Sequence, residues 1–258
     1  MHFPINKFYL VMMIKNTLIF MCMFTIATLT FGGFDIIRGI FAFLGFVFAY
    51  HSVYFFNDLM DYESDKKSAR KRAINPLLNG QITKKGALSN MFLYSIIGLM
   101  LSFSVGLIFG AIIAALLLTN FLHSSNKTRL KESVFCFPNL FVMQCLKVSA
   151  AWFAVSNSLE GFPISVVLSF GLFYLVTYSY AKRMEKLPLL SFLMQGKIVL
   201  LMVSASCCYL YALFVYPYGL FLSIFVLLTF AFAIAWNIVL KKKIKPGYSI
   251  KFELNKKL

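Results

Sequence analysis

Long apolar runs recur along the whole of this 258-residue chain and constrain its fold more than any other feature. Each run has roughly 18 to 25 residues, which is enough for a helix to cross about 30 Å of hydrocarbon. Because the bilayer core offers the backbone no hydrogen-bond partners, spans of this length must be α-helices. A hydrophobic content of 60% with only 13% charged residues excludes an ordinary soluble domain. The sequence therefore predicts an all-α, polytopic transmembrane helix bundle.

The runs predict about eight spans. They lie at 9–31, 34–56, 89–106, 108–123, 134–155, 163–180, 190–213 and 218–240. The region 89–123 is too long for one span, and Gly106 and Gly110 favour a break within it, although a single long tilted helix is the alternative. We expect one domain, a transmembrane bundle over 1–240, followed by a basic tail over 241–258.

The distribution of positive charge predicts the topology. A formal net charge of +16 could indicate nucleic-acid binding, but the basic residues follow the spans instead of forming a separate basic domain. All of them except Arg38, Lys147 and Lys197 lie near the N-terminus, in the loops after the second, fourth and sixth spans, or in the tail. In an eight-span bundle these segments share one side, which the positive-inside rule assigns to the cytoplasm. We therefore expect an integral protein of the inner or plasma membrane, in contact with membrane lipid, with both termini cytoplasmic and no nucleic-acid partner.

The segment from Asn57 to Asp65 holds four of the nine acidic residues and directly follows the second span. The helical pattern continues into it, and spacings of three and four residues place Asp58, Asp61 and Asp65 on one helix face beside Asn57. Ionisable groups at a membrane edge are costly unless they are paired or bind a cation. Carboxylate oxygens suit Mg²⁺. The three aspartates are therefore the predicted metal ligands and catalytic residues.

A dense basic segment, 66–72, follows the acidic one. Carboxylates that hold Mg²⁺ next to Lys and Arg side chains are typical of a site for a phosphorylated substrate. For Lys66 and Lys67 the alternative is that they only follow the positive-inside rule. Asn75-Pro76 and Asn79-Gly80 are turn signals that predict a loop folded back over the site.

The pattern Asn57-Asp58-x-x-Asp61-x-x-x-Asp65, followed by Lys71-Arg72-x-x-Asn-Pro-Leu-Leu-Asn-Gly, resembles the first signature of the UbiA superfamily of intramembrane prenyltransferases. The resemblance implies Mg²⁺-dependent transfer of a prenyl group from an isoprenoid diphosphate to a hydrophobic or aromatic acceptor. It also implies that Asn57 and the aspartates hold Mg²⁺ and the donor diphosphate, while Lys71 and Arg72 contact phosphate. Asn75 departs from the family, which often has arginine there.

The second signature of those enzymes, an aspartate-rich motif after the sixth span, has no counterpart here, because the segment 178–187 contains no aspartate. Ser179, Lys182 and Arg183 share a helix face, and the two cations would offset phosphate charge without a second metal. Membrane anchoring is the alternative role for them. This segment, together with Met13-Ile14-Lys15-Asn16, resembles the branch of polyprenyl-phosphate phosphoribosyltransferases.

Lys147 and Lys197 lie inside predicted spans, where a lysine is costly unless it faces the bundle cavity. The phosphoribosyltransferase branch often has an arginine near the position of Lys147, so we assign Lys147 to substrate binding. For Lys197 the alternative is a side chain that extends to the membrane surface.

Two alternative functions remain open at this point. The first is phosphoribosyl transfer from phosphoribosyl diphosphate to a polyprenyl phosphate. The second is a degenerate, non-catalytic homologue that binds isoprenoid lipids, since the second aspartate motif and the family's usual ninth helix are missing. The sequence indicates no oligomeric state.

Overall fold

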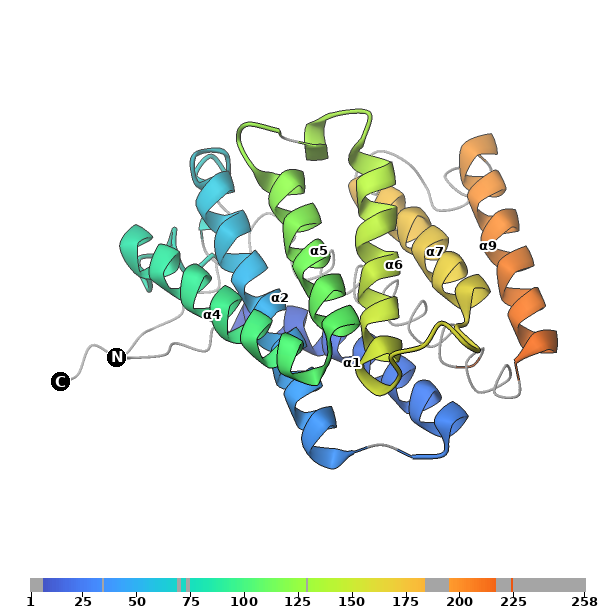
Figure 1. Cartoon of the computed structure of the whole chain (residues 1–258). Helices are drawn as coiled ribbons and strands as arrows, with labels where there is room; N and C mark the ends of the chain where they lie inside the picture. The colour runs from blue at the N-terminus through green and yellow to red at the C-terminus, as the bar shows by residue number, and fades with distance from the viewer. Residues whose placement is uncertain are drawn as a thin grey trace.

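The computed structural model describes residues 7–33, 35–68, 71–72, 75–128, 130–183, 195–216 and 224. In this part of the chain the structure consists of seven α-helices and one short 3₁₀ helix, and no strand is present (Figure 1). The helices are α1 (Lys7–Phe31), α2 (Ile36–Asp65), α4 (Lys84–Val105), α5 (Leu107–Ser124), η1 (Leu130–Glu132), α6 (Cys136–Val155), α7 (Ile164–Arg183) and α9 (Gly196–Val215). The predicted all-α fold is confirmed.

Four of these helices, α2, α4, α5 and α9, are long and apolar enough to cross a membrane. Shorter apolar stretches lie in α1 and α7. The predicted break in 89–123 is confirmed, since α4 ends at Val105 and α5 begins at Leu107. The predicted span 218–240 (apart from residue 224) and the tail 241–258 lie outside the described residues, so the count of about eight spans stays a prediction.

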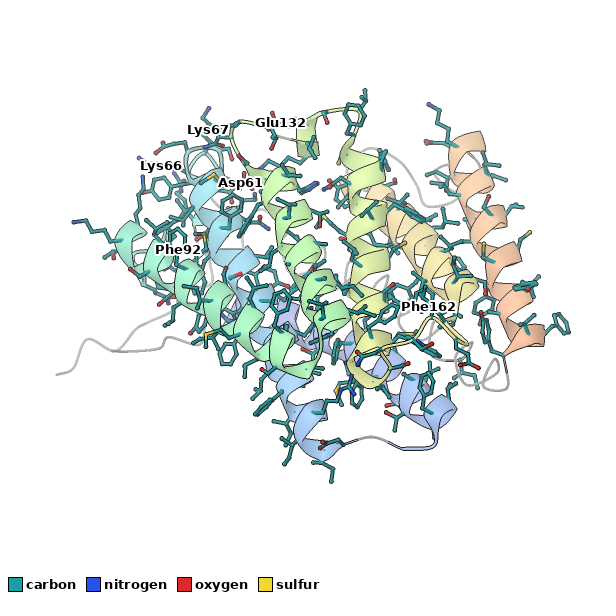
Figure 2. The ribbon with its side chains drawn as sticks, in the orientation of Figure 1. Asp61, Lys66, Lys67, Phe92, Glu132 and Phe162 are labelled. Atoms are coloured by element: carbon teal, nitrogen blue, oxygen red, sulfur yellow. The ribbon has the colours of Figure 1, made fainter. Side chains whose placement is uncertain are left out.

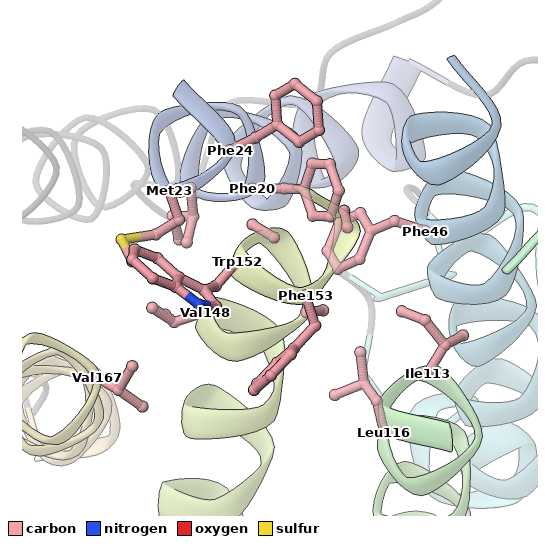
Figure 3. Close-up of a cluster of buried hydrophobic side chains, with 14 of the residues drawn as sticks. Phe20, Met23, Phe24, Phe46, Ile113, Leu116, Val148, Trp152, Phe153 and Val167 are labelled. Atoms are coloured by element: carbon pink, nitrogen blue, oxygen red, sulfur yellow. The ribbon is translucent and has the colours of Figure 1, made fainter. Parts of the chain in front are cut away.

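Helix α6 is the centre of the bundle and packs against α1, α5 and α7, while α2 packs against α4 and α5, and α9 packs against α7. The largest side chains of the core converge between α1, α2, α5 and α6 (Figure 3). Phe20 of α1 stacks on Phe46 of α2 with ring centroids 4.6 Å apart, and Trp152 of α6 is fully buried. Burial of such aromatic side chains supplies much of the apolar area that holds a bundle together.

Small residues bring α2 and α4 into backbone contact. A Cβ atom added to Gly98 would lie 2.5 Å from the backbone nitrogen of Ala49, and one added to Gly45 would lie 2.7 Å from Ser102 Oγ. In a membrane the hydrophobic effect does not drive helices together. Close backbone contacts of this kind stabilise helix association through van der Waals packing instead. The contact holds α2, which carries the acidic segment, in a fixed position.

Helix α2 is longer than a bilayer core requires. Its 30 residues extend about 45 Å at 1.5 Å per residue, against about 30 Å of hydrocarbon. Asp35 caps its first turn by accepting a hydrogen bond from the Ile37 backbone N–H at 2.8 Å. The C-terminal part of α2 reaches the end of the bundle where the loop before α4 and the loop between α5 and α6 also lie (Figure 1).

The loop before α4 folds back on the bundle, as the two turn signals predict. Asn75 Oδ1 accepts a hydrogen bond from the Leu77 backbone N–H at 2.9 Å, and Gly80 takes the positive φ of 81° that the second turn needs. Leu77 is buried in a cluster with Phe55 and Met91. Asn75, which stands where the family often has arginine, is therefore a buried turn residue in this chain.

Candidate active site

Two aspartates of the acidic segment are paired with lysines from different loops. Lys131 of η1 forms an ion pair with Asp61, and Lys71 forms one with Asp65. Both carboxylates are largely shielded, with side-chain exposures of 22% for Asp61 and 10% for Asp65. Asp61 and Glu132 lie at the same end of the bundle in Figure 2. The structure thus joins the loop between α5 and α6 to the acidic face of α2.

The basic residues Lys71 and Arg72 lie close to the C-terminal end of α2. The Arg72 guanidinium donates to the backbone carbonyl of Lys66 at 3.4 Å, one residue beyond the helix. Cations are favoured there because the last carbonyls of a helix carry partial negative charge. The structure therefore brings these two predicted phosphate-binding residues together with Asp65.

Glu63 lies on a different face of α2 from the three aspartates, because it is two residues from both Asp61 and Asp65. Its carboxylate is 3.8 Å from Lys84 Nζ, and that ammonium also lies 3.7 Å from the centroid of the Tyr62 ring. The side chains are 78% and 60% exposed for Glu63 and Lys84. An ion pair this exposed contributes little to stability, so Glu63 serves as a natural reference for the aspartates.

A cavity of about 190 Å³ lies inside the bundle next to the acidic segment. We call it the polar chamber. It is lined by Asn16, Tyr50, Val53, Tyr54, Asn57, Asn120, His123, Leu140, Met143, Gln144, Lys147, Tyr174 and Tyr178. Tyr50, Tyr54, Asn57 and Asp61 follow one another at helical spacings of four, three and four residues, so one face of α2 leads from the chamber to the aspartates.

Lys147 lies in the polar chamber and is only 2% exposed. Its ammonium donates to Asn16 Oδ1 at 2.7 Å and lies 4.7 Å from the centroid of the Tyr50 ring. Asn16 in turn donates to the Tyr54 hydroxyl at 2.6 Å. Tyr50 precedes Asp61 by eleven residues, so the two residues lie about 16 Å apart along the axis of α2. The structure places Lys147 in the chamber and apart from Lys71 and Arg72.

The donor atoms at the end of α2 fit Mg²⁺. Asn57 Oδ1 is buried and has no hydrogen-bond partner among the described residues, and it lines the chamber beside Asp58 on the same helix. The described part of the chain contains no group of three His, Cys, Asp or Glu residues that could hold a metal. Mg²⁺ does not require one, because it is usually held by one or two carboxylates together with substrate phosphates and water.

Lys182 and Arg183 lie in the last turn of α7 by their backbone positions, and their side chains are outside the described part of the structure. Tyr178, one turn earlier on the same helix, lines the chamber. Lys197, at the start of α9, is exposed and lies next to a different cavity.

Tyr50 and Gln144 line the chamber, and no sequence pattern had indicated a role for either of them. Gln144 lies three residues before Lys147, so the two share one face of α6. A polar pair at this spacing in an apolar span is the signal that could have indicated the chamber. The contact of Lys131 with Asp61 could not be predicted from sequence, because it spans seventy residues.

Replacing Lys131 with methionine is expected to release the loop between α5 and α6 from α2. The ion pair with Asp61 is partly buried, so its loss leaves a shielded carboxylate and weakens the attachment of residues 125–135. Amide hydrogen exchange in that loop should become faster. Lys84→Met, which removes an exposed pair, is the matched control, and equal exchange in both variants would contradict the assignment.

The chain matches the UbiA prenyltransferase family over residues 18–252. A comparison with curated proteins finds no match. Among solved structures, the chain is similar to a UbiA homolog from Archaeoglobus fulgidus bound to GPP and Mg²⁺, with a TM-score of 0.67, 13% identity, and coverage of 92% of this chain and 86% of that one. The homolog bound to DMAPP and Mg²⁺ has the same TM-score and coverage with 12% identity. A further structure of a UbiA homolog from that organism has a TM-score of 0.56 and 12% identity, covering 90% of this chain and 88% of that chain.

Proposed function

The chain belongs to the UbiA prenyltransferase family of integral membrane proteins, and from this membership we propose that it transfers a prenyl group from an isoprenoid diphosphate to an acceptor held in the polar chamber. One observation carries the proposal. Asp61 and Asp65, each paired with a lysine from a loop, lie on the face of α2 that leads into the chamber. Structures of the Archaeoglobus fulgidus homolog bound to GPP or DMAPP with Mg²⁺ support a donor of this class.

The proposed donor site is the end of the bundle where α2 ends. Asp58, Asp61 and Asp65 would hold Mg²⁺, with Asn57 as a further oxygen ligand or orienting group. When bound, Mg²⁺ supplies Lewis-acid stabilisation of the diphosphate leaving group. Lys71 and Arg72 would bind the remaining phosphate oxygens through charge-assisted hydrogen bonds. Lys182 and Arg183, in the last turn of α7, are assigned to the same diphosphate.

The proposed reaction breaks the bond between the allylic carbon and the diphosphate oxygen, and the electron pair leaves with the diphosphate. A nucleophilic atom of the acceptor then bonds to that carbon and loses its proton. The rings of Tyr54 and Tyr178, which line the chamber, would stabilise positive charge on the allylic carbon, because the face of an aromatic ring attracts cations.

We place the donor site on the cytoplasmic side of the membrane. The loops rich in Lys and Arg adjoin the end of α2, and such loops stay in the cytoplasm by the positive-inside rule. Soluble diphosphate donors and Mg²⁺ would then reach the aspartates directly from the cytoplasm.

A second candidate, phosphoribosyl transfer to a polyprenyl phosphate, is favoured by one observation. Asn16 and Lys147 both fall in segments that resemble the phosphoribosyltransferase branch, and the structure joins them by a hydrogen bond of 2.7 Å. In this scheme the donor is a soluble sugar diphosphate and the lipid is the acceptor.

The two candidates differ in which donor labels a product. Purified protein in lipid nanodiscs is incubated with Mg²⁺ and a cell extract, and receives either labelled geranyl diphosphate or labelled phosphoribosyl diphosphate. Prenyl transfer predicts a labelled product from geranyl diphosphate that chelation of Mg²⁺ abolishes. A labelled lipid from phosphoribosyl diphosphate alone would reject prenyl transfer in favour of the second candidate. No product from either donor would reject both and leave a non-catalytic homologue that binds isoprenoid lipids.

A further inference from the structure

A second cavity, of about 680 Å³, lies between α6, α7 and α9 at the end of the bundle where α9 begins (Figure 1). We call it the lateral cavity. It is lined by Phe137 of α6, by Leu175 and Ser179 of α7, and by residues 195–198, 200 and 201 at the start of α9. Its volume lies within the range of about 300–1,000 Å³ that is typical of sites for small organic molecules.

The lateral cavity is separate from the polar chamber, although α7 borders both. Tyr174 and Tyr178 line the chamber, whereas Leu175 and Ser179, each one position further along α7, line the lateral cavity. Consecutive residues of a helix point about 100° apart, so two faces of α7 serve two different spaces. No described residue lines both cavities. A ligand of the lateral cavity is therefore not the acceptor that we place in the chamber.

Ser179 is the observation that indicates a ligand in the lateral cavity. It is 5% exposed, and its hydroxyl makes no hydrogen bond with another described residue. Other hydroxyls of α7 bond back to their own helix: Ser169 Oγ donates to the Val166 carbonyl at 3.2 Å, and Thr177 Oγ1 donates to the Tyr174 carbonyl at 2.8 Å. Buried polar groups in native proteins are nearly always hydrogen-bonded. A ligand in the lateral cavity would satisfy the Ser179 hydroxyl.

Positive charge lies at the same cavity. Lys197 lines it, is exposed, and has no ion-pair partner among the described residues. Gly196 and Lys197 begin α9, a helix of 20 residues, and the preceding residue Gln195 makes no side-chain capping bond to its first turn. The first N–H groups of a helix carry partial positive charge and bind phosphate groups. An ammonium, a helix N-terminus and a serine hydroxyl at one cavity together favour a phosphate anion.

The other walls of the lateral cavity are apolar, and one of them faces outward. Phe137, Leu175, Ile198 and Leu201 form the apolar lining. Leu200 also lines the cavity and is 67% exposed, on a helix that is apolar enough to cross a membrane. A soluble phosphate would gain nothing from these walls, whereas a phospholipid has a phosphate and acyl chains. Basic pockets between membrane helices on the cytoplasmic side are typical sites for anionic lipid headgroups.

We infer that the lateral cavity binds an anionic phospholipid of the cytoplasmic leaflet, the side on which we place this end of the bundle. Lys197, Ser179 and the first turn of α9 bind the phosphate, and Leu175 and Leu201 contact the upper part of an acyl chain. The lipid fills the space between α7 and α9 and so stabilises their packing. This site goes beyond the proposed function, because the bound lipid is not a substrate.

Native mass spectrometry of the full chain in detergent tests the inference. The probes are phosphatidylglycerol, phosphatidylcholine with the same acyl chains, and glycerol phosphate, which has the phosphate without the chains. We expect one phosphatidylglycerol to bind more tightly than either other probe and to raise the melting temperature, because a ligand of the native state stabilises it. Equal binding of phosphatidylcholine would show that the charge is not recognised. Equal binding of glycerol phosphate would show that the acyl chains are not recognised. Either result would overturn the inference.

Two variants test the residues separately, each with a matched control. Lys197→Met should weaken phosphatidylglycerol binding about fivefold, the usual effect of one basic residue on an anionic lipid. Ser179→Ala should weaken it about twofold to tenfold, the effect of one hydrogen bond. Lys127→Met removes the same charge from an exposed loop position, and Ser169→Ala removes a hydroxyl that bonds its own helix. Both controls should bind as the unmodified protein does. If either variant binds as tightly as its control, the inference is overturned.

Folding and the proposed function are checked independently of the lateral cavity. Melting temperatures without added lipid show which variants fold, and if Ser179→Ala does not fold, Lys197→Met and its control decide the outcome. Geranyl diphosphate with Mg²⁺ should leave phosphatidylglycerol binding unchanged, because the two cavities share no described lining residue. Displacement of the lipid by geranyl diphosphate would assign the lateral cavity to the diphosphate and overturn the inference. Phosphatidylglycerol binding without turnover of any prenyl or phosphoribosyl donor would reject the proposed function and leave the lipid site standing.

Discussion

Replacing Asp61 with asparagine is expected to reduce Mg²⁺-dependent prenyl transfer by at least about a hundredfold, the usual effect of removing one group that stabilises a developing anionic charge. Asp61 is the central carboxylate of the acidic face and the one that Lys131 contacts. Asparagine preserves size and hydrogen bonding but removes the charge that a divalent cation requires. Product formation from labelled geranyl diphosphate, measured across a Mg²⁺ titration, gives both the rate and the metal dependence.

Glu63→Gln is the control for Asp61→Asn. Glu63 belongs to the same nine-residue segment, yet its side chain is 78% exposed and faces Lys84. The same change of charge at this position should leave the rate and the Mg²⁺ dependence within about twofold, because exposed ion pairs have small energies. If both variants lose the same amount of activity, the rate depends on the net charge of the segment and not on which face of α2 carries the carboxylate. Full activity in Asp61→Asn would remove this aspartate from the proposed metal site.

The second large effect is expected from Gly98→Ala. The added Cβ atom would lie 2.5 Å from the backbone nitrogen of Ala49, and a backbone atom cannot move aside as a flexible side chain does. Helices α2 and α4 must separate, which we expect to cost about 1–3 kcal/mol of stability, as for other overpacked sites. Thermal unfolding in detergent should show a lower melting temperature, together with weaker Mg²⁺-dependent binding of geranyl diphosphate because α2 carries the aspartates.

Gly196→Ala provides the comparison for Gly98→Ala. Gly196 begins α9, and an added Cβ atom would meet no other atom within 4 Å. Alanine there should leave the melting temperature unchanged or raise it slightly, because alanine favours helix more than glycine does. If both alanine variants melt at the same temperature, the close contact of α2 and α4 does not contribute to stability as we argue.

The acidic face of α2 illustrates what could be predicted from sequence. Asp58, Asp61 and Asp65 are linked by spacings of three and four within a single helix, and helix geometry alone then places them on one face. The break at Gly106 and the two turns before α4 were also predictable, because each depends on glycine, proline or asparagine at one local position. In each case the relevant interactions span only a few residues of the chain.

The polar chamber illustrates what sequence could not supply. Its central contact joins Asn16 to Lys147 across 131 residues, and its walls come from α1, α2, α5, α6 and α7. Lys147 was assigned to substrate binding from its cost inside a span and from the arginine that the phosphoribosyltransferase branch often has near its position. Nothing in the sequence indicated Asn16 and Tyr50 as its neighbours. The pairing of Asp61 with Lys131 likewise depends on how the loop between α5 and α6 lies over α2.

The sequence by itself determined that this chain is a bundle of membrane helices with an acidic face at the end of its second span, because apolar length and helical periodicity are local properties. Only the tertiary structure decided that a buried lysine shares one small chamber, near that face, with two amide oxygens that have no hydrogen-bond partner among the described residues. The physical reason is that the relative positions of helices depend on which side chains pack between them. Contacts such as Phe20 on Phe46 and Gly98 against Ala49 set those positions, and they join residues that are distant in sequence.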